Sequence, residues 1–360
     1  MFVRHTQSTA SQAGSSGHLA IAAACALALL SSCGGRTTFE ERQSTEVPAP
    51  KQPDMGPSPD VTKKTPPKVS DPVPTPVPTP IGPNRPLVSP PLCAGDAPFG
   101  EPSQLPGIDP SLSIEGAWLS DDRLELIVGA RAGDAAATEF DLRVARRESI
   151  EVAFGALAAV NELNSIAIER KPVLTMDGLS LFFESDRLGE TSDIFLAERA
   201  LVGGKFGDAR LVTEVSTPRN DAPGSMSVAN TLYFTAVRMG GEGTENLFQA
   251  ARNGDGTFSE RYLISSVDSD GSNVAPAISS DELTLYFSSN RDNREDQNHD
   301  VFRARRPASD KLFGLPLAVA ELNSNSSDIV TWVSLDECRL LLTRETAPGT
   351  GRFNLLLAER

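Results

Sequence analysis

Polar residues that recur at one position of a repeated segment are the strongest candidates for chemistry in this sequence. Each stands three residues before a recurring proline position, and the set is Ser113, Glu169, Asn220, Asn273 and Asp328. If the repeats close into a ring, these side chains would gather at the mouth of a central channel and could bind a ligand or a cation. Hydrogen bonding between neighbouring repeats would also explain them. Only Glu169 and Asp328 are acids, so they are the one pair that could act as the two carboxylates of a glycan hydrolase.

Histidine is scarce, which removes several catalytic classes. The chain has three histidines, and we expect His5 and His18 to be lost with an N-terminal signal. The remaining His299 cannot build a multi-histidine zinc site, and a Ser-His-Asp triad could form only through it. The acidic loop Asp292–Asp300 does not have the spacing of a calcium-binding EF-hand. We therefore expect no metal ion, no cofactor and no catalytic set.

The net charge argues against one class of partner. The chain carries a formal charge of −15, and the part from Cys93 to Arg360 holds 25 basic and 42 acidic residues, about −17. A strongly acidic surface repels the phosphates of nucleic acids. Nucleic acid is therefore excluded as an expected partner.

The N-terminus has the pattern of an export signal. Leu19–Leu30 is an apolar run of 12 residues, too short to span a bilayer but suited to the core of a signal peptide. The sequence Leu30-Ser31-Ser32-Cys33 follows and resembles the bacterial lipobox. The resemblance implies a signal peptide over 1–32, lipid attachment at Cys33 and anchoring to a membrane. An uncleaved signal anchor is the alternative.

A proline-rich stretch separates this signal from the rest of the chain. Of the 27 prolines, 16 lie between Pro48 and Pro91. Such a composition favours extended polyproline II over a packed fold. We therefore predict a disordered tether over 33–92 and a folded domain over 93–360.

The folded domain is repetitive. Segments Pro172–Arg199, Pro276–Arg306 and Val330–Arg360 share one pattern: a short strand, a turn, an apolar strand ending in Arg, a polar loop, and a strand that opens with Asp or Asn. Two weaker copies are Gly116–Arg147 and Pro223–Arg252, in which Ala229-Asn230 replaces the expected Asp-Gly. The recurring arginines are Arg131, Arg187, Arg238, Arg291 and Arg344. The strand-opening residues are Asp141, Asp193, Asn246, Asp300 and Asn354. We expect each arginine to pair with the strand-opening residue of its own repeat.

A period of about 50 residues with several short strands per unit is typical of β-propeller blades. The segments LSLFFES and LTLYFSS, with Asp177-Gly178 before the first, resemble the TolB-like propeller repeat. The resemblance implies an all-β, single propeller, and protein partners as a class. The visible copies predict five blades, although five could be part of six.

The two ends of the domain are predicted to meet in one blade. The last copy stops at Arg360 after its third strand, and Phe99-Gly100 resembles Phe206-Gly207 before a fourth strand. An N-terminal strand should therefore complete the C-terminal blade and remove an exposed sheet edge. Cys93 and Cys338 both fall in this blade, and exported proteins meet an oxidising compartment. They are predicted to form a disulfide, with two free buried thiols as the alternative.

Two functions remain open from the sequence. The first is a non-catalytic protein- or ligand-binding module of the cell envelope, lipid-anchored in the outer membrane and facing the periplasm. Gly34 after Cys33 favours that sorting. Its partner would be an envelope protein or a glycan. The second is a hydrolase that acts on glycan or peptide at the channel mouth, with Glu169 and Asp328 as its candidate residues.

Overall fold

The computed structural model describes residues 93, 97–132, 139–237, 244–292 and 297–360. The chain divides into units of Met1–Val77 and Pro78–Arg360, and all described residues belong to the second. The predictions about the signal peptide, Cys33 and the tether over 33–92 therefore lie outside the described residues.

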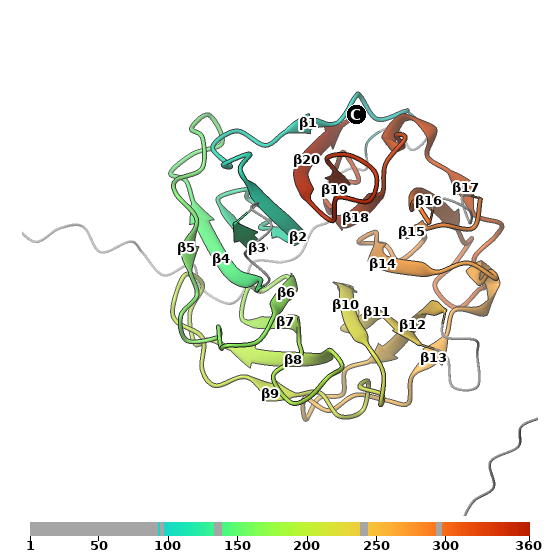
Figure 1. Cartoon of the computed structure of the whole chain (residues 1–360). Helices are drawn as coiled ribbons and strands as arrows, with labels where there is room; N and C mark the ends of the chain where they lie inside the picture. The colour runs from blue at the N-terminus through green and yellow to red at the C-terminus, as the bar shows by residue number, and fades with distance from the viewer. Residues whose placement is uncertain (1–92, 94–96, 133–138, 238–243, 293–296) are drawn as a thin grey trace, which may run out of the picture. The chain divides into compact units, whose positions relative to one another are not determined.

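The described residues form five four-stranded antiparallel sheets set around a centre, as Figure 1 shows. Blade 1 contains β2 (Leu112–Leu119), β3 (Glu125–Ala132), β4 (Asp141–Arg146) and β5 (Ala158–Ala159). Blade 2 contains β6 (Glu169–Leu174), β7 (Ser180–Ser185), β8 (Asp193–Glu198) and β9 (Arg210–Leu211). Blade 3 contains β10 (Asp221–Met226), β11 (Thr231–Val237), β12 (Glu245–Ala251) and β13 (Tyr262–Leu263). Blade 4 contains β14 (Asn273–Ile278), β15 (Thr284–Ser289), β16 (Asp300–Arg305) and β17 (Leu317–Ala318). Blade 5 contains β18 (Asp328–Val333), β19 (Arg339–Glu345), β20 (Phe353–Glu359) and β1 (Ser103–Gln104).

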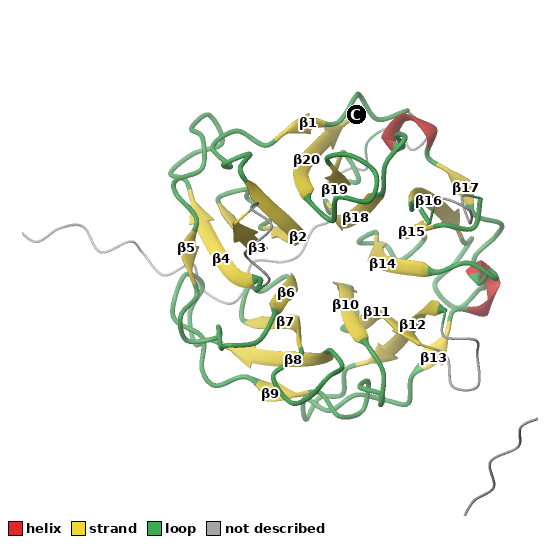
Figure 2. Cartoon of the chain, viewed as in Figure 1, coloured by secondary structure: helices red, strands yellow, loops and turns green. Residues whose placement is uncertain are grey.

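The fold is a five-bladed β-propeller, as the repeats predict, and the alternative of six blades is wrong. Within the described residues the only helices are two short 3₁₀ turns, η1 (Ser265–Val267) and η2 (Ala320–Leu322), both on the rim in Figure 2. In every blade the first strand lines the centre and the fourth lies at the edge.

Hydrophobic packing occurs between blades, not at a single centre. The buried apolar residues fall into five clusters, and each cluster joins two neighbouring blades. The second strands β7 and β15 are buried at every position because a blade covers each of their faces. Strands covered on both faces are expected to be apolar throughout, which explains the runs LFF and LYF.

The ring closes through the N-terminal strand, also as predicted. Ser103 pairs with Leu357 and Gln104 with Leu356, so β1 supplies the fourth strand of blade 5. Before it, the Gly100 N–H donates to the Glu359 carbonyl at 2.8 Å. The equivalent bond of blade 2 joins Gly207 N to Glu198 O at the same distance. The resemblance between these two segments therefore reflects one structural role.

The predicted disulfide is present at this closure. Cys93 and Cys338 are bonded, with their Cα atoms 5.2 Å apart across 245 residues of sequence. The Cys93 N–H also donates to the Asp336 carbonyl at 2.9 Å. The start of the described chain is thus fixed to the turn between the first two strands of blade 5.

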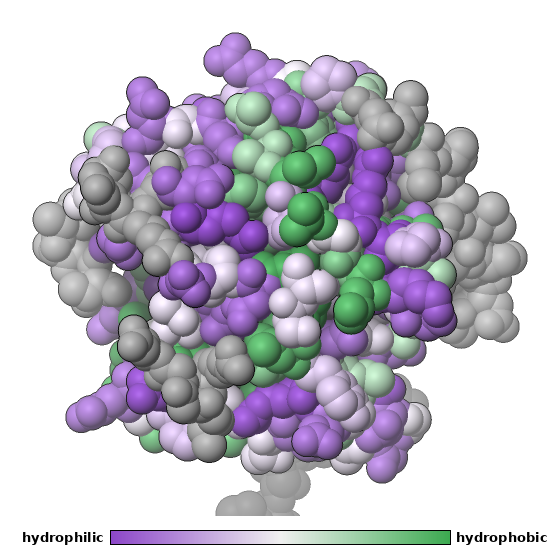
Figure 3. Space-filling view, turned by 90° about the vertical axis from the view of Figure 1, so that its right-hand side faces the viewer, coloured by the Kyte–Doolittle hydropathy of each residue, from purple (hydrophilic) through white to green (hydrophobic). Residues whose placement is uncertain are grey.

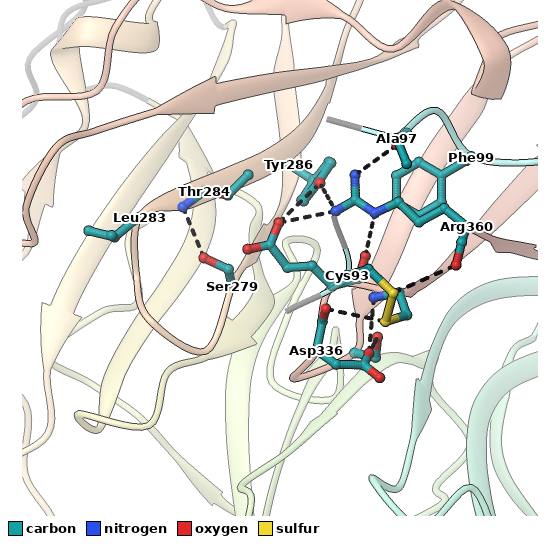
Figure 4. A network of polar contacts seen from close by, with 12 residues as sticks. Cys93, Ala97, Phe99, Ser279, Leu283, Thr284, Tyr286, Asp336 and Arg360 are labelled. Atoms are coloured by element: carbon teal, nitrogen blue, oxygen red, sulfur yellow. Dashed lines mark hydrogen bonds and ion pairs between the residues drawn. A yellow bond between two sulfur atoms is a disulfide. The ribbon is translucent and has the colours of Figure 1, made fainter. Parts of the chain in front are cut away.

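A second series of arginines was not predicted to have a role, and four of its five members bond to a neighbouring blade. They follow the third strand of each blade and are Arg147, Arg199, Arg252, Arg306 and Arg360. The Arg360 Nε donates to the Glu337 carbonyl at 2.7 Å, and its Nη2 to the Tyr286 hydroxyl of blade 4 at 3.2 Å. Its guanidinium lies 4.5 Å from the centre of the Phe99 ring. Figure 4 shows this arginine between the ring of Phe99, the Tyr286 hydroxyl and the disulfide.

The outer edge of blade 4 exposes apolar side chains. Leu312, Leu315 and Leu317 are 77%, 85% and 63% exposed. The side view in Figure 3, taken from the right of Figure 1, shows a hydrophobic band between hydrophilic regions. Pro316 interrupts this segment and lacks a backbone N–H, which makes the edge a poor template for strand addition.

Candidate functional site

The residues predicted to line a channel mouth are mostly buried. Ser113, Glu169, Asn273 and Asp328 are 0%, 0%, 1% and 0% exposed. The last three open the inner strands β6, β14 and β18. They occupy equivalent places in their blades, as the spacing predicts, but they do not form an open ring of ligand groups.

Hydrogen bonds account for the two carboxylates proposed for catalysis. Glu169 accepts from the Ser165 hydroxyl at 2.6 Å, the Ser165 N–H at 2.9 Å and the Ser185 hydroxyl at 3.0 Å. Asp328 accepts from the Ser324 hydroxyl and N–H at 2.8 and 2.7 Å. Each carboxylate therefore fastens the loop that precedes its own inner strand.

Recurring arginines complete these sites, and the predicted pairing is wrong for Arg187, Arg291 and Arg344. Arg187 Nη2 lies 3.0 Å from Glu169, and Arg344 Nε lies 2.6 Å from Asp328. Each guanidinium thus reaches the inner strand of its blade instead of the Asp or Asn that opens the third strand. Burial is the physical reason, because a carboxylate removed from water needs a cation, whereas Asp193 is only half-buried and has Ser216 as a polar neighbour. Arg291 bonds Asn273 in the same way at 2.6 Å.

In blade 3 the prediction named Asn220, but the equivalent position is occupied by the next residue, Asp221. Asn220 is exposed and caps the neighbouring loop, accepting from the Ser192 N–H at 3.1 Å. Asp221 opens β10 and accepts from the Thr217 N–H, as Glu169 does from Ser165. The proline of this repeat, Pro223, stands one position closer to the strand start, so counting back three residues reached the wrong side chain.

Asp221 has an unusual protonation equilibrium. Its side chain is 1% exposed, and burial raises its pKa to about 7. The nearby Asp193 contributes to this shift, while hydrogen bonds from Thr217 and the charge of Arg261 oppose it. Arg238, the recurring arginine of this blade, lies outside the described residues. The carboxyl of Asp221 therefore changes its charge near neutral pH.

An ion-pair cluster joins blades 1 and 2 beside the inner strands. Arg170 pairs with Glu115 of β2 and with Glu184 of β7, and Lys171 lies 2.8 Å from the other Glu184 oxygen. Burial alone would raise the pKa of Glu184, but Lys171 and Arg170 outweigh it and lower the pKa to about 2. This carboxylate stays ionised and is unsuited to act as a general acid.

The opposite end of the inner strands, where they run into their first turns, forms a pocket of about 100 Å³. Its walls include Trp118 of β2, Trp332 of β18 and Met226 of β10. Trp118 and Trp332 are the only tryptophans of the chain, and both are half-buried. Indole rings left partly in solvent beside a cavity are typical of binding sites, since they offer a large apolar face and one N–H donor.

Each blade contributes the second residue of its first turn to the rim of this pocket: Asp121, Met176, Val228, Ser280 and Leu335. These turns close with a backbone in the left-handed region, at Gly178 (φ 71°) in blade 2 and at Asn230 (φ 59°) in blade 3. Asn tolerates that region better than most residues, which explains how Ala229-Asn230 replaces Asp-Gly. Cys338 follows the blade 5 turn, so the disulfide fixes Cys93 beside the rim.

The pocket was not predicted from the sequence, although the sequence carries a signal for it. Trp118 and Trp332 each stand two residues before the Ser that opens the turn, Ser120 and Ser334. They therefore occupy the same position of the repeat in blades 1 and 5, and these two blades are neighbours in the closed ring.

No group of three or more His, Cys, Asp or Glu side chains in the described part of the chain could hold a metal ion. No helix among those residues is long and apolar enough to cross a bilayer.

Comparison with known proteins returns structural neighbours but no sequence match. No protein-family model and no curated protein matches the sequence. A putative TolB from Agrobacterium tumefaciens is 14% identical, with 64% of this chain and 70% of that chain covered and a TM-score of 0.43. The α-L-arabinofuranosidase PaAbf62A from Podospora anserina is 8% identical, with 73% and 96% covered and a TM-score of 0.47. The family 117 glycoside hydrolase Zg3597 from Zobellia galactanivorans is 10% identical, with 73% and 90% covered and a TM-score of 0.46. Identities this low assign no activity, and what stands for this chain is its five-bladed β-propeller fold.

Proposed function

We propose that this protein is a non-catalytic binding module of the cell envelope, and that its ligand enters the pocket lined by Trp118 and Trp332. One observation carries the proposal: both tryptophans of the chain lie at one end of the channel, partly exposed, on the wall of the same cavity. Tryptophan is strongly enriched among residues that dominate binding energy.

Lipid attachment at Cys33 and a periplasmic location at the outer membrane belong to the same proposal. They derive from the lipobox-like sequence and from Gly34 after it. Labelling of the full-length protein with a fatty-acid analogue tests this part, and Cys33→Ser should abolish the label. An unchanged label on the variant would contradict it.

The burial of Glu169 and Asp328 weighs against the hydrolase alternative. Both carboxylates are inaccessible and hold a loop through serine and arginine partners. A catalytic acid or nucleophile must reach the substrate directly.

The test compares capture of envelope proteins and glycans by the full-length protein and by a Trp118→Ala, Trp332→Ala double variant. We expect specific capture by the parent and at least a tenfold loss for the variant. Leu201→Ala is a matched control, because Leu201 is 66% exposed and does not line the pocket. Capture that does not depend on the tryptophans would overturn the site. Hydrolysis of a glycan or peptide that is lost in Glu169→Gln or Asp328→Asn, with the fold retained, would overturn the non-catalytic assignment.

A further inference from the structure

The pocket between the two tryptophans has a charged surround that its apolar walls do not reveal. The five turns at its rim are Ser120–Arg123, Thr175–Gly178, Ser227–Asn230, Ser279–Glu282 and Ser334–Glu337. Their acidic residues are Asp121, Asp122, Asp177, Asp281, Glu282, Asp336 and Glu337, and their one basic residue is Arg123. The turns themselves are therefore acidic, with two arginines from outside them, Arg147 and Arg199, donating to the Arg123 and Gly178 carbonyls.

Part of this negative charge is neutralised within the fold. Glu282 lies 3.7 Å from Arg306, Glu337 lies 3.3 Å from Arg360, and Asp336 lies 3.5 Å from Arg339. These three acids belong to contacts that hold the ring together.

Four turn aspartates remain, and all four are exposed: Asp121, Asp122, Asp177 and Asp281. The last three each use the Oδ1 atom to hold their own turn. In blade 2 that atom accepts from the Thr175 hydroxyl at 2.6 Å and the Leu179 N–H at 3.0 Å. The acceptor atom maintains the turn, and the negative charge of these three side chains lies on the turns around the pocket, whose lining includes Asp121.

We infer that the pocket takes the cationic side chain of an arginine or lysine from a partner protein. The inference rests on the proposed function and gives the chemical class of the ligand. Guanidinium and ammonium groups bind the faces of tryptophan rings, and their methylene stems pack on apolar walls such as Met176 and Met226. Carboxylates around the opening attract the charge and reject acidic side chains.

The size of the cavity indicates a side chain rather than a free small molecule. Sites that enclose a whole ligand usually have volumes of about 300–1,000 Å³. This pocket has about 100 Å³, which is room for one side chain that anchors a larger partner.

The test uses the intrinsic fluorescence of the full-length protein, because its two tryptophans both line the pocket. The probes are blocked peptides of four glycines around a central arginine, lysine, norleucine or glutamate. We expect the arginine and lysine peptides to bind at least tenfold more tightly than norleucine, and the glutamate peptide to give no response. High salt should weaken only the two cationic peptides.

A charge-only variant gives the matched comparison. Asn keeps the Oδ1 acceptor, so Asp122→Asn, Asp177→Asn and Asp281→Asn together should leave the turns intact and weaken the arginine peptide at least tenfold. Asp255→Asn is the control, since Asp255 holds its own turn through the Thr257 hydroxyl and N–H but lies outside the pocket. Caesium ions should quench the parent more than iodide does, and the triple variant should lose that difference.

The outcomes separate this inference from the proposed function. Equal binding of norleucine and arginine would overturn the cationic ligand and leave an apolar binding pocket. If no peptide binds while capture from the envelope still depends on Trp118 and Trp332, the cationic ligand is also overturned and the proposed binding function stands. Capture that does not depend on either tryptophan would overturn the proposed function as well.

Discussion

Glu169 and Asp221 occupy the same position of neighbouring blades in different electrostatic surroundings. Both are buried, and both accept an N–H from the loop before their strand. Glu169 has Arg187 at 3.0 Å, whereas burial raises the pKa of Asp221 and the carboxylate of Asp193 adds to the shift, against the opposing charge of Arg261. A buried carboxylate beside another carboxylate holds its proton more tightly. One structural position can therefore contribute to stability or respond to pH, depending on its neighbours.

Asp221 should make the stability of the ring depend on pH. Its pKa is about 7 in the folded protein, against about 3.9 in an unfolded chain. Between these values the unfolded chain binds fewer protons, so the free energy of unfolding should fall as pH rises from about 4 to 7 and then level off. Asp221→Asn should remove this part of the slope and be about 1–3 kcal/mol more stable than the parent at pH 8. Urea unfolding across this pH range measures it, and parallel profiles for the two proteins would contradict it.

Arg123 should be replaceable with a gain in stability. It has a φ of 61° at the turn position that Gly178 fills in blade 2, a backbone region that costs a non-glycine residue about 1 kcal/mol. Its charge also opposes that of Arg147. Arg123→Gly is therefore expected to raise the unfolding free energy by about 0.5–1 kcal/mol. Thermal unfolding checks this, with Lys311→Gly as the control at an exposed site. A lower midpoint for Arg123→Gly would refute it.

At the scale of the blade, arginines connect elements in two directions. The series that includes Arg187 holds the inner strand to the loop before it, and also donates to a loop carbonyl, Leu163 O, at 2.6 Å. The series that includes Arg306 connects one blade to the previous one. The Arg306 Nη2 donates to the Tyr233 hydroxyl of blade 3 at 3.1 Å. Contacts of this second kind recur at Arg199, Arg252 and Arg360, so blades 2 to 5 each depend on the blade before them for part of their stability.

Breaking one contact between blades should be costly. Arg306 also donates from Nε to the Glu282 carbonyl at 2.6 Å and lies over the Phe313 ring, and it is 8% exposed. Arg306→Met leaves that carbonyl and the Tyr233 hydroxyl without their donor, and should cost about 2–4 kcal/mol. A double-mutant cycle with Tyr233→Phe should give a coupling of about 1 kcal/mol.

The control for that cycle is Lys311→Met, which breaks an exposed ion pair with Asp310. It should change stability by less than about 0.5 kcal/mol. A coupling near zero for Arg306 and Tyr233 would show that the two blades do not depend on this bond.

At the scale of the molecule, the ring is stabilised by joining its two ends. The five hydrophobic clusters lie at the five interfaces between blades. The interface between blade 5 and blade 1 includes residues beside β1, so it is complete only when β1 has joined blade 5. Phe99 lies in one of these clusters, and Leu105 and Ile108 lie in another. The strand β1 and the segments beside it therefore contribute backbone pairing and apolar contacts on both sides of the closure.

Removing the disulfide should weaken this closure without changing the fold. A disulfide that spans 245 residues stabilises the fold by at most about 5 kcal/mol in the loop-entropy model. Disulfides in proteins typically contribute about 2–4 kcal/mol to the free energy of unfolding. Cys93→Ser with Cys338→Ser should lower the urea midpoint while the transition stays cooperative. A reductant should lower the midpoint of the parent and leave that of the double variant unchanged. If the parent does not respond to reductant, the closure does not depend on the bond.

The sequence alone was enough to predict the all-β class, the five blades, the strand that closes the ring and the pairing of Cys93 with Cys338. These features follow from a repeat period and from the positions at which the repeat is incomplete, and both are properties of the linear chain. The apolar second strands carry the same information, since a strand covered on both faces must be apolar.

Tertiary structure alone decided what the polar residues do. Glu169 and Asp328 recur as predicted, but only the packing of the loops shows that they are buried beside Arg187 and Arg344. The offset from Asn220 to Asp221 depends on where one proline stands in its strand. The pocket needs Trp118 and Trp332, which lie 214 positions apart in the sequence, to become neighbours when the ring closes. Burial and partners are set by distances in space, and a repeat pattern gives only positions along the chain.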